Sequence, residues 1–174
     1  SNPSSNRTLK LPSNADGTIV TSTSPDSDRF KTGEVVQVTA SVITSSVILN
    51  NSHINQYNDT PMTASITPKF ADSKIIVNFQ FALLMRDNGG NSALGYAVKR
   101  NGTRVLTSAS NPHEQFVSGS GSPLTGFRTT YTYVDTTHNS TSQQTYLLEV
   151  FLRNYSNMVA EFNSRSETAN VVIY

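Results

Sequence analysis

The chain has 174 residues, a length typical of one domain, and its formal net charge at pH 7 is +1. A charge this close to balance, without a run of like charges, argues against nucleic-acid or membrane-surface binding driven by bulk electrostatics. Cysteine is absent, which excludes disulfides and thiolate metal sites, and no apolar run approaches the roughly 20 residues of a membrane helix. We therefore expect neither nucleic-acid binding nor insertion into a membrane.

Residues 1–34 are poor in large apolar side chains and rich in turn-forming residues. The clear apolar positions before Phe30 are Leu9, Leu11, Ile19 and Val20. Such a segment cannot by itself bury enough surface to offset the entropy lost on ordering, so we expect it to pack against copies of itself. Its first residues, SNPSSNRT, lack the layout of a signal peptide and resemble the interior of a polypeptide, so we expect the chain to be the carboxy-terminal piece of a longer one.

Strand-like alternation begins near residue 35, where we place the boundary of a second region, 35–174. Apolar residues alternate with polar ones from Val36 to Val42, which predicts a strand, and a short apolar group follows at 47–49. Residues 50–60 are polar and are predicted to form a connection.

The stretch 62–86, MTASITPKFADSKIIVNFQFALLMR, predicts two half-buried strands joined by a short turn. The apolar set of the second strand recurs with period two from Ile75 to Met85. Its other face carries Ile76, Ala82 and Leu84, which makes that face too apolar for full solvation. Two explanations remain open for it: packing of a second sheet, or contact with another subunit.

The remainder of the chain predicts further short strands. A loop at 87–91 precedes a strand at 94–100, and Asn101-Gly102 between strand residues predicts a hairpin with a type I′ turn. A long loop at 109–125 leads to a strand at 127–133. After a polar connection at 135–143, a strand at 146–152 is apolar on both faces and is expected to be central and covered. The last two strands are predicted at 159–163 and 168–174.

No window of helical length shows a 3.6-residue apolar period with caps. About eight short strands separated by polar turns predict an all-β protein. We expect an antiparallel jelly-roll-like β-sandwich from about residue 35 onward.

The order of several short elements resembles a known family. The run LKLPSNADGTIVTS near the start is similar to elements found along trimeric phage tail-fibre shafts. The later part of the chain resembles a carboxy-terminal head domain. The elements that carry this resemblance are, in order, VVQV, MTASITPKFADSKIIVNFQFAL, the NG hairpin, a Tyr-rich strand ending in VD, QTYLLEVFLRN and an apolar closing strand. Such heads are common in tail fibres and other virion fibres of bacteriophages, marine podoviruses in particular.

The resemblance implies a homotrimer located on a virion. Three shaft-like segments, 1–34, would wrap about one axis and carry three sandwich heads, 35–174, in contact with other virion or tail proteins. The residues expected at the trimer interface are Leu9, Leu11, Ile19, Val20, Ile76 and Leu84.

Catalytic patterns receive no support from the residues. His53, His113 and His138 lack metal-ligand spacing and lie in predicted polar loops, where solvated histidines are the ordinary case. No Gly-x-Ser-x-Gly elbow joins a strand to a helix. Asp135 and Glu149 lie in separate predicted elements, so a glycosidase-type carboxylate pair has no positive support. The loop 87–91 lacks the spaced acidic ligands of a calcium loop. We expect no enzyme activity, no cofactor and no metal.

Binding by loops is the remaining class of function. Successive loops of an antiparallel sandwich alternate between its ends, so 86–92, 109–125 and 154–158 are expected at one end and 101–102, 135–143 and 164–168 at the other. Planar amide, guanidinium and aromatic groups suit the hydroxyls and faces of sugars, although ordinary solvated loops have the same composition. The candidate receptor-binding residues are Arg86, Asp87, Asn88, Asn91, His113, Asn154 and Tyr155.

Three functions therefore stand at this point. The first is a trimeric fibre head that contacts a host-surface glycan or an outer-membrane receptor. The second is a capsid or other virion fibre protein without a receptor role. The third is a free-standing carbohydrate-binding module, which would not need residues 1–34.

Overall fold

The structure is a computed structural model that describes residues 35, 37–86, 91–106, 115–118, 124–154, 159–163 and 168–174. All of them belong to one compact unit, Val35–Tyr174. The predicted shaft-like segment 1–34, with Leu9, Leu11, Ile19 and Val20, lies outside the described residues, and so its role in trimerisation stays a prediction.

The described residues form eleven strands and one short 3-10 helix, η1 (Asn51–His53). The strands are β1 (Thr39–Ile43), β2 (Val47–Leu49), β3 (Tyr57–Ile66), β4 (Ile75–Arg86), β5 (Asn91–Arg100), β6 (Thr103–Leu106), β7 (Gln115–Ser118), β8 (Leu124–Asp135), β9 (Gln144–Asn154), β10 (Val159–Phe162) and β11 (Ala169–Ile173).

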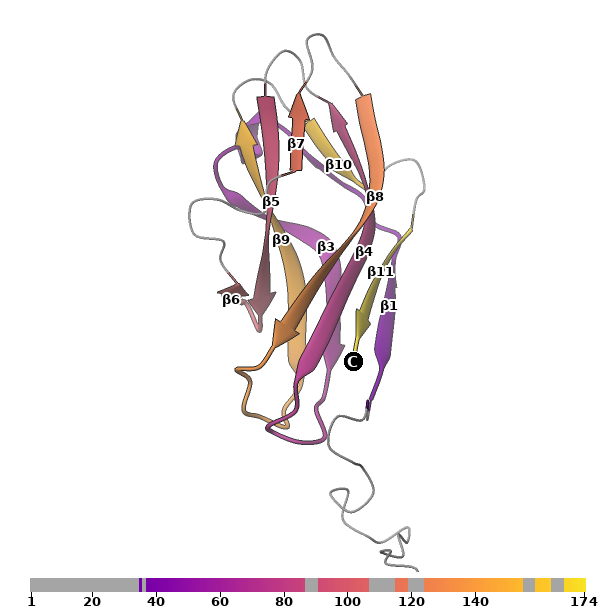
Figure 1. Cartoon of the computed structure of the whole chain (residues 1–174), viewed down its shortest axis with the longest axis vertical. Coiled ribbons are helices and arrows are strands. Elements are labelled where there is room, and N and C mark those ends of the chain that lie inside the picture. The colour runs from indigo at the N-terminus through magenta and orange to yellow at the C-terminus, as the bar shows by residue number, and fades with distance from the viewer. Residues whose placement is uncertain are drawn as a thin grey trace, which may run out of the picture. The chain divides into compact units, whose positions relative to one another are not determined.

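These strands form two sheets, which Figure 1 shows as two layers. In the first sheet, β8 lies on one side of β4 along its whole length, while β10 and β11 share the other side and pair in turn with β2 and β1. In the second sheet, β9 lies between β3 and β5, and β6 and β7 share the far side of β5. All pairs between these strands are antiparallel.

The strand order is that of a jelly roll. Three strand positions are each divided into two strands: β1 with β2, β6 with β7, and β10 with β11. Counted along the chain, the eight positions then occur in the order 1-8-3-6 in the first sheet and 2-7-4-5 in the second. This is the two-sheet, double Greek-key arrangement of jelly rolls, so the predicted antiparallel jelly-roll-like sandwich is confirmed.

The core lies between the two sheets and is built by the period-two pattern of each strand. On β4 every second side chain from Ile75 to Met85 is buried, and the same holds on β9 from Tyr146 to Leu152. The alternate face of β4 points away from the second sheet, and Ile76 on it is 37% exposed. Sheet-on-sheet packing is therefore the wrong explanation for the Ile76 face.

Several predicted elements differ from the structure in pairing or extent. The two strands predicted within 62–86 are β3 and β4, and they lie in different sheets, because their buried faces meet across the core. β3 begins at Tyr57 inside the predicted polar connection, where Thr60 Oγ1 donates to the Leu148 carbonyl (2.7 Å). β7 lies inside the predicted long loop. Neither 57–61 nor β7 shows apolar residues alternating with polar ones, so the sequence pattern gave no strand signal there.

The predicted hairpin at Asn101-Gly102 and the central position of β9 are confirmed. Asn101 and Gly102 have φ of 50° and 80°, as a type I′ turn requires, and β5 pairs with β6 across them. Asn101 Oδ1 also accepts from the Thr145 backbone N–H (2.8 Å), which fastens this turn to β9. β9 is covered completely on its core face only, since Leu147 and Phe151 on its other face are half-buried.

A buried carboxylate joins the two sheets at the end of β8. Asp135 is 0% exposed and accepts hydrogen bonds from Arg100 Nη1 of β5 (2.7 Å) and from the Tyr146 hydroxyl of β9 (2.7 Å). Its other oxygen accepts from the backbone N–H (2.8 Å) and hydroxyl (2.9 Å) of Thr137. Burial alone would raise the pKa of Asp135, but the hydrogen bonds from Thr137, Tyr146 and Arg100 outweigh it and lower this pKa to about 2.

Acid is therefore expected to destabilise the fold between the ordinary pKa of this carboxyl, 3.8, and its folded pKa of about 2. The pKa of this carboxyl is lower in the folded chain than in the unfolded chain. Such a carboxyl stabilises the folded chain fully when the pH is above its pKa in the unfolded chain. The stabilisation is lost as the pH falls toward its pKa in the folded chain. For Asp135 this amounts to about 2 kcal/mol of unfolding free energy. The pKa of Glu149 is also lowered, because hydrogen bonds from Arg104 and Lys99 outweigh its burial, and it acts in the same direction. Urea unfolding at a series of pH values checks this, and an unfolding free energy that stays constant over this range would contradict it.

Candidate functional site: a polar pocket on the first sheet

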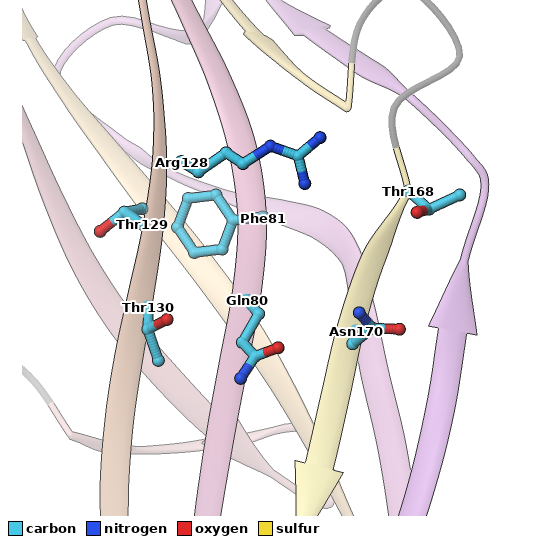
Figure 2. A pocket seen from close by; sticks show the side chains of 7 residues that line it. All are labelled: Gln80, Phe81, Arg128, Thr129, Thr130, Thr168 and Asn170. Atoms are coloured by element: carbon cyan, nitrogen blue, oxygen red, sulfur yellow. The ribbon is translucent and has the colours of Figure 1, made fainter.

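A pocket of about 390 Å³ opens on the outer face of the first sheet (Figure 2). Its lining comes from β4, β8, the start of β11 and Thr168, which directly precedes β11. The lining residues are Gln80, Phe81, Arg128, Thr129, Thr130, Thr168 and Asn170. These seven residues are spread over 91 positions of the sequence, from 80 to 170, and only the pairing of the three strands brings them together.

The pocket lies where the strand beside β4 is interrupted. β10 pairs with β4 as far as Leu83, and β11 resumes the pairing at Gln80. After Phe162, Asn163 has φ of 52°, and its N–H donates to the Ala82 carbonyl (3.0 Å). Among the described residues, the strand pairing on this side of β4 is therefore interrupted between Leu83 and Gln80. The predicted position of the 164–168 connection, at the same end as 101–102, concerns residues that lie outside the described part of the chain except for Thr168. On either side of it, Phe162 and Asn170 pair with the middle of β4.

The lining is rich in groups that bind hydroxyls. The carboxamides of Gln80 and Asn170 each offer a donor and an acceptor, and the threonine hydroxyls offer both in one group. Figure 2 shows the Arg128 side chain extending from β8 across β4 toward the side where Thr168 lies. Its guanidinium adds a fixed positive charge with several donors. None of the seven lining residues carries a carboxylate or an imidazole, so they supply hydrogen bonds and one cation without a general acid or base of those types.

The predicted receptor-binding loops are described only at the strand ends that flank them. Arg86 ends β4, Asn91 begins β5 and Asn154 ends β9, and for these three the structure describes the backbone alone. The register pairs Ser92 with Asn154 and Arg86 with both Leu124 and Val159, so these ends do meet at one end of the sandwich. The remaining predicted residues, Asp87, Asn88, His113 and Tyr155, lie outside the described residues. The pocket was not among the predicted sites.

A second polar cluster lies on the outer face of the second sheet. Glu149 of β9 is 1% exposed, and it accepts from Arg104 Nη2 (2.8 Å) and pairs with Lys99 Nζ (3.1 Å). Lys99 also pairs with Asp59 (2.6 Å), and the Arg104 guanidinium lies 4.0 Å from the Tyr57 ring centroid. Two acidic and two basic groups thus neutralise one another. This cluster stabilises the face of its sheet and leaves little unpaired charge for a ligand.

Two of the histidines have positions that the sequence did not predict. His138 is 6% exposed, so the expectation of a solvated loop histidine is wrong for it. His53 Nδ1 accepts from the Asn50 N–H (3.2 Å) and completes a capping box of η1. In the described part of the chain, no cluster of His, Cys, Asp or Glu is arranged to hold a metal ion, and no helix is long and apolar enough to span a membrane.

The two predicted interface residues within the head lie on the outer face of β4. Ile76 is exposed, whereas Leu84 is half-buried near Gly126 of β8. A Cβ atom at Gly126 would lie 3.3 Å from Leu84 Cδ1, so the missing side chain makes room for Leu84. Of the two, Ile76 is the more accessible to another chain.

No protein-family model matches the chain, and no curated protein matches it either. Solved structures that the chain matches include a mutant VP2 protein of infectious bursal disease virus in derived T=1 particles (14% identity, TM-score 0.39) and the structure of the Gt strain of that virus (14% identity, TM-score 0.39). A VP2 subviral particle of the same virus gives 12% identity and a TM-score of 0.39. The matches cover 80%, 80% and 79% of this chain but only 36%, 38% and 37% of those chains, so the chain spans a little over a third of their length. At this level of likeness, what those proteins do gives no information on the function of this chain.

Proposed function

We propose that the chain is a structural protein of a virion, the head of a homotrimeric bacteriophage fibre that contacts the host surface and other virion proteins. The observation that carries the proposal is the jelly-roll strand order of 35–174, the region in which the sequence resembles a fibre head. The shaft-like run LKLPSNADGTIVTS, which precedes that region in the chain, supports the trimeric part of the proposal. The role is non-catalytic.

The pocket on the first sheet is the proposed contact for a host glycan. Gln80 and Asn170 would bind sugar hydroxyls through their carboxamides, and Arg128 would bind a hydroxyl or the carboxylate of an acidic sugar. These residues lie on strands, and a rigid sheet fixes their spacing better than a loop does. An outer-membrane protein with exposed glycan would present the same chemistry.

Two measurements test this proposal. Light scattering of the full chain should give about three times the 18.9 kDa chain mass, unchanged on dilution. On a glycan array, the wild type should bind a defined set of sugars, and the double variant Gln80→Ala with Arg128→Ala should bind them at least about tenfold more weakly, since each lost hydrogen bond is worth about 1 kcal/mol. Thr132→Ala, an exposed change on the same face beside Asn78, is the matched control and should bind like the wild type.

A free-standing carbohydrate-binding module is the second candidate, and the polar lining of the pocket favours it. It predicts the same loss of glycan binding in the double variant but a mass of one chain. If the chain is a trimer but binds no glycan on the array, the result would instead favour a capsid or other virion fibre protein that has no receptor role. A monomer that binds no glycan would contradict both candidates.

A further inference from the structure

Four exposed apolar side chains form a continuous row across the outer face of the first sheet. Val134 of β8 is 48% exposed, Ile76 of β4 is 37% exposed, Tyr174 after β11 is 39% exposed and Val38 before β1 is 54% exposed. They make up more than half of the seven large apolar side chains that are exposed in the described part of the chain. Isolated apolar residues are ordinary on a surface, but a contiguous group of them indicates a contact.

The register of the sheet places these four residues side by side. Ile76 pairs with Val134, and Ile76 and Tyr174 exchange both backbone hydrogen bonds (3.1 and 2.9 Å). Thr39 pairs with Ile173, and the same antiparallel register, extended by one residue, places Val38 opposite Tyr174. Figure 1 shows the corresponding ends of β8, β4, β11 and β1 together at one end of this sheet, with the end of the chain between β4 and β1.

On the side of the row that faces the pocket, the adjoining surface is free of charged side chains, whereas the exposed Lys74 lies two residues before Ile76 on the other side. The next two rows along β4, at Asn78 and Gln80, run across the same four strands and hold only Thr, Asn, Gln, Val and Ala side chains. The outer face of the second sheet, in contrast, carries the ion pairs around Glu149. On its uncharged side, the row can meet an identical row without bringing like charges together.

We infer that the row Val134, Ile76, Tyr174 and Val38 is the surface through which the heads of three copies of this chain contact one another. Residues 1–34 join the head at Val35, three residues before the Val38 end of the row. A trimeric shaft made of three such segments would therefore bring the Val38 ends of three rows toward one axis. The inference rests on the proposed homotrimer, and it names the part of the head that the trimer would bury.

The size of the surface explains why the shaft would be needed. Four strands about 4.8 Å apart and two rows about 6.7 Å apart, those at Ile76 and Asn78, cover roughly 260 Å². This is about a third of the roughly 800 Å² per partner in a stable interface, so separate heads would associate weakly. Joining them through a common shaft raises their effective concentration to about the millimolar range, which is enough for a weak contact to persist. Gln80 of the pocket lies about 13 Å along β4 from Ile76, so a contact centred on the row leaves the pocket accessible.

Cross-linking of the full-length chain tests the inference, because the sequence contains no cysteine. Ile76→Cys places a single thiol at the centre of the row, and Ile48→Cys places one at an exposed apolar site on the same sheet but outside the row. A short bismaleimide should join chains of the Ile76→Cys variant and leave those of the Ile48→Cys variant unjoined. Val134→Lys, combined with Ile76→Cys, should abolish the cross-link because it places three positive charges at the contact.

The outcomes separate this inference from the proposed function. Three chain masses with no cross-link at Ile76→Cys would overturn the inference and leave the trimeric fibre standing. One chain mass together with no cross-link would overturn both. A cross-link of equal yield at Ile76→Cys and Ile48→Cys would show random collision and would also overturn the inference. Binding of the wild type to lipid vesicles, lost in Val134→Lys, without any cross-link would assign the row to a membrane surface instead.

Discussion

Replacing Asp135 by asparagine is expected to lower the free energy of unfolding by about 3 kcal/mol, because it breaks a buried ion pair and a buried hydrogen-bond network. Asp135 is fully buried and links β8 of the first sheet to Arg100 and Tyr146 of the second. The amide cannot accept at both of its ends, so the Tyr146 hydroxyl or the Thr137 N–H loses its acceptor inside the protein. Urea unfolding near neutral pH, followed by circular dichroism, measures the change.

Asp59→Asn is the matched control for this prediction. Asp59 also pairs with a cation, Lys99 (2.6 Å), but its side chain is 56% exposed. Exposed ion pairs contribute at most about 1 kcal/mol, so this variant should unfold nearly as the wild type does. Asp135→Asn should also flatten the acid dependence of stability, since the carboxyl whose pKa is lowered is gone. Equal effects of the two substitutions would mean that the Asp135 network does not join the sheets.

Truncating Phe81 to alanine should cost about 3–5 kcal/mol, the usual range for a buried phenylalanine. Phe81 of β4 is 3% exposed, and its ring lies 5.5 Å from that of Phe162 in its own sheet and 5.7 Å from that of Tyr96 in the opposite sheet. Tyr96 in turn lies 5.2 Å from Tyr131 of β8, so Phe81 is part of a chain of rings that connects the two layers. The loss combines the transfer of the ring to water with the cavity that remains. Thermal unfolding and urea titration measure it.

Two further variants make the Phe81 result specific. Phe81→Leu keeps most of the buried apolar volume and should cost clearly less than the alanine variant. Ile48→Ala, at a site 57% exposed, should change the unfolding free energy by less than about 0.5 kcal/mol. If Phe81→Ala were as mild as Ile48→Ala, the two sheets would not be packed through these rings.

The sequence by itself determined the class of fold and most of its strands. Period-two alternation along β4 and β9 follows directly from one buried face per strand, and Asn101-Gly102 specifies its turn through two residues that tolerate positive φ. These are local signals, and they were sufficient to predict a jelly-roll-like sandwich. The alternation does not indicate, however, which face of a strand the other sheet covers. The apolar set at Val38, Ala40 and Val42 predicted a strand correctly, although the structure turns that set outward.

Only the tertiary structure decided which surfaces the fold offers to ligands and to other chains. Gln80, Arg128 and Asn170 are ordinary polar residues of three strands, and they became a pocket because β8 and β11 pair with opposite sides of β4. Asp135 and Arg100 form an ion pair because β8 and β5, which belong to different sheets, end at the same level. The row through Ile76 likewise depends on the register of four strands drawn from opposite ends of the chain. Register between distant strands is set by the packing of the whole core, so no local pattern in the sequence contains it.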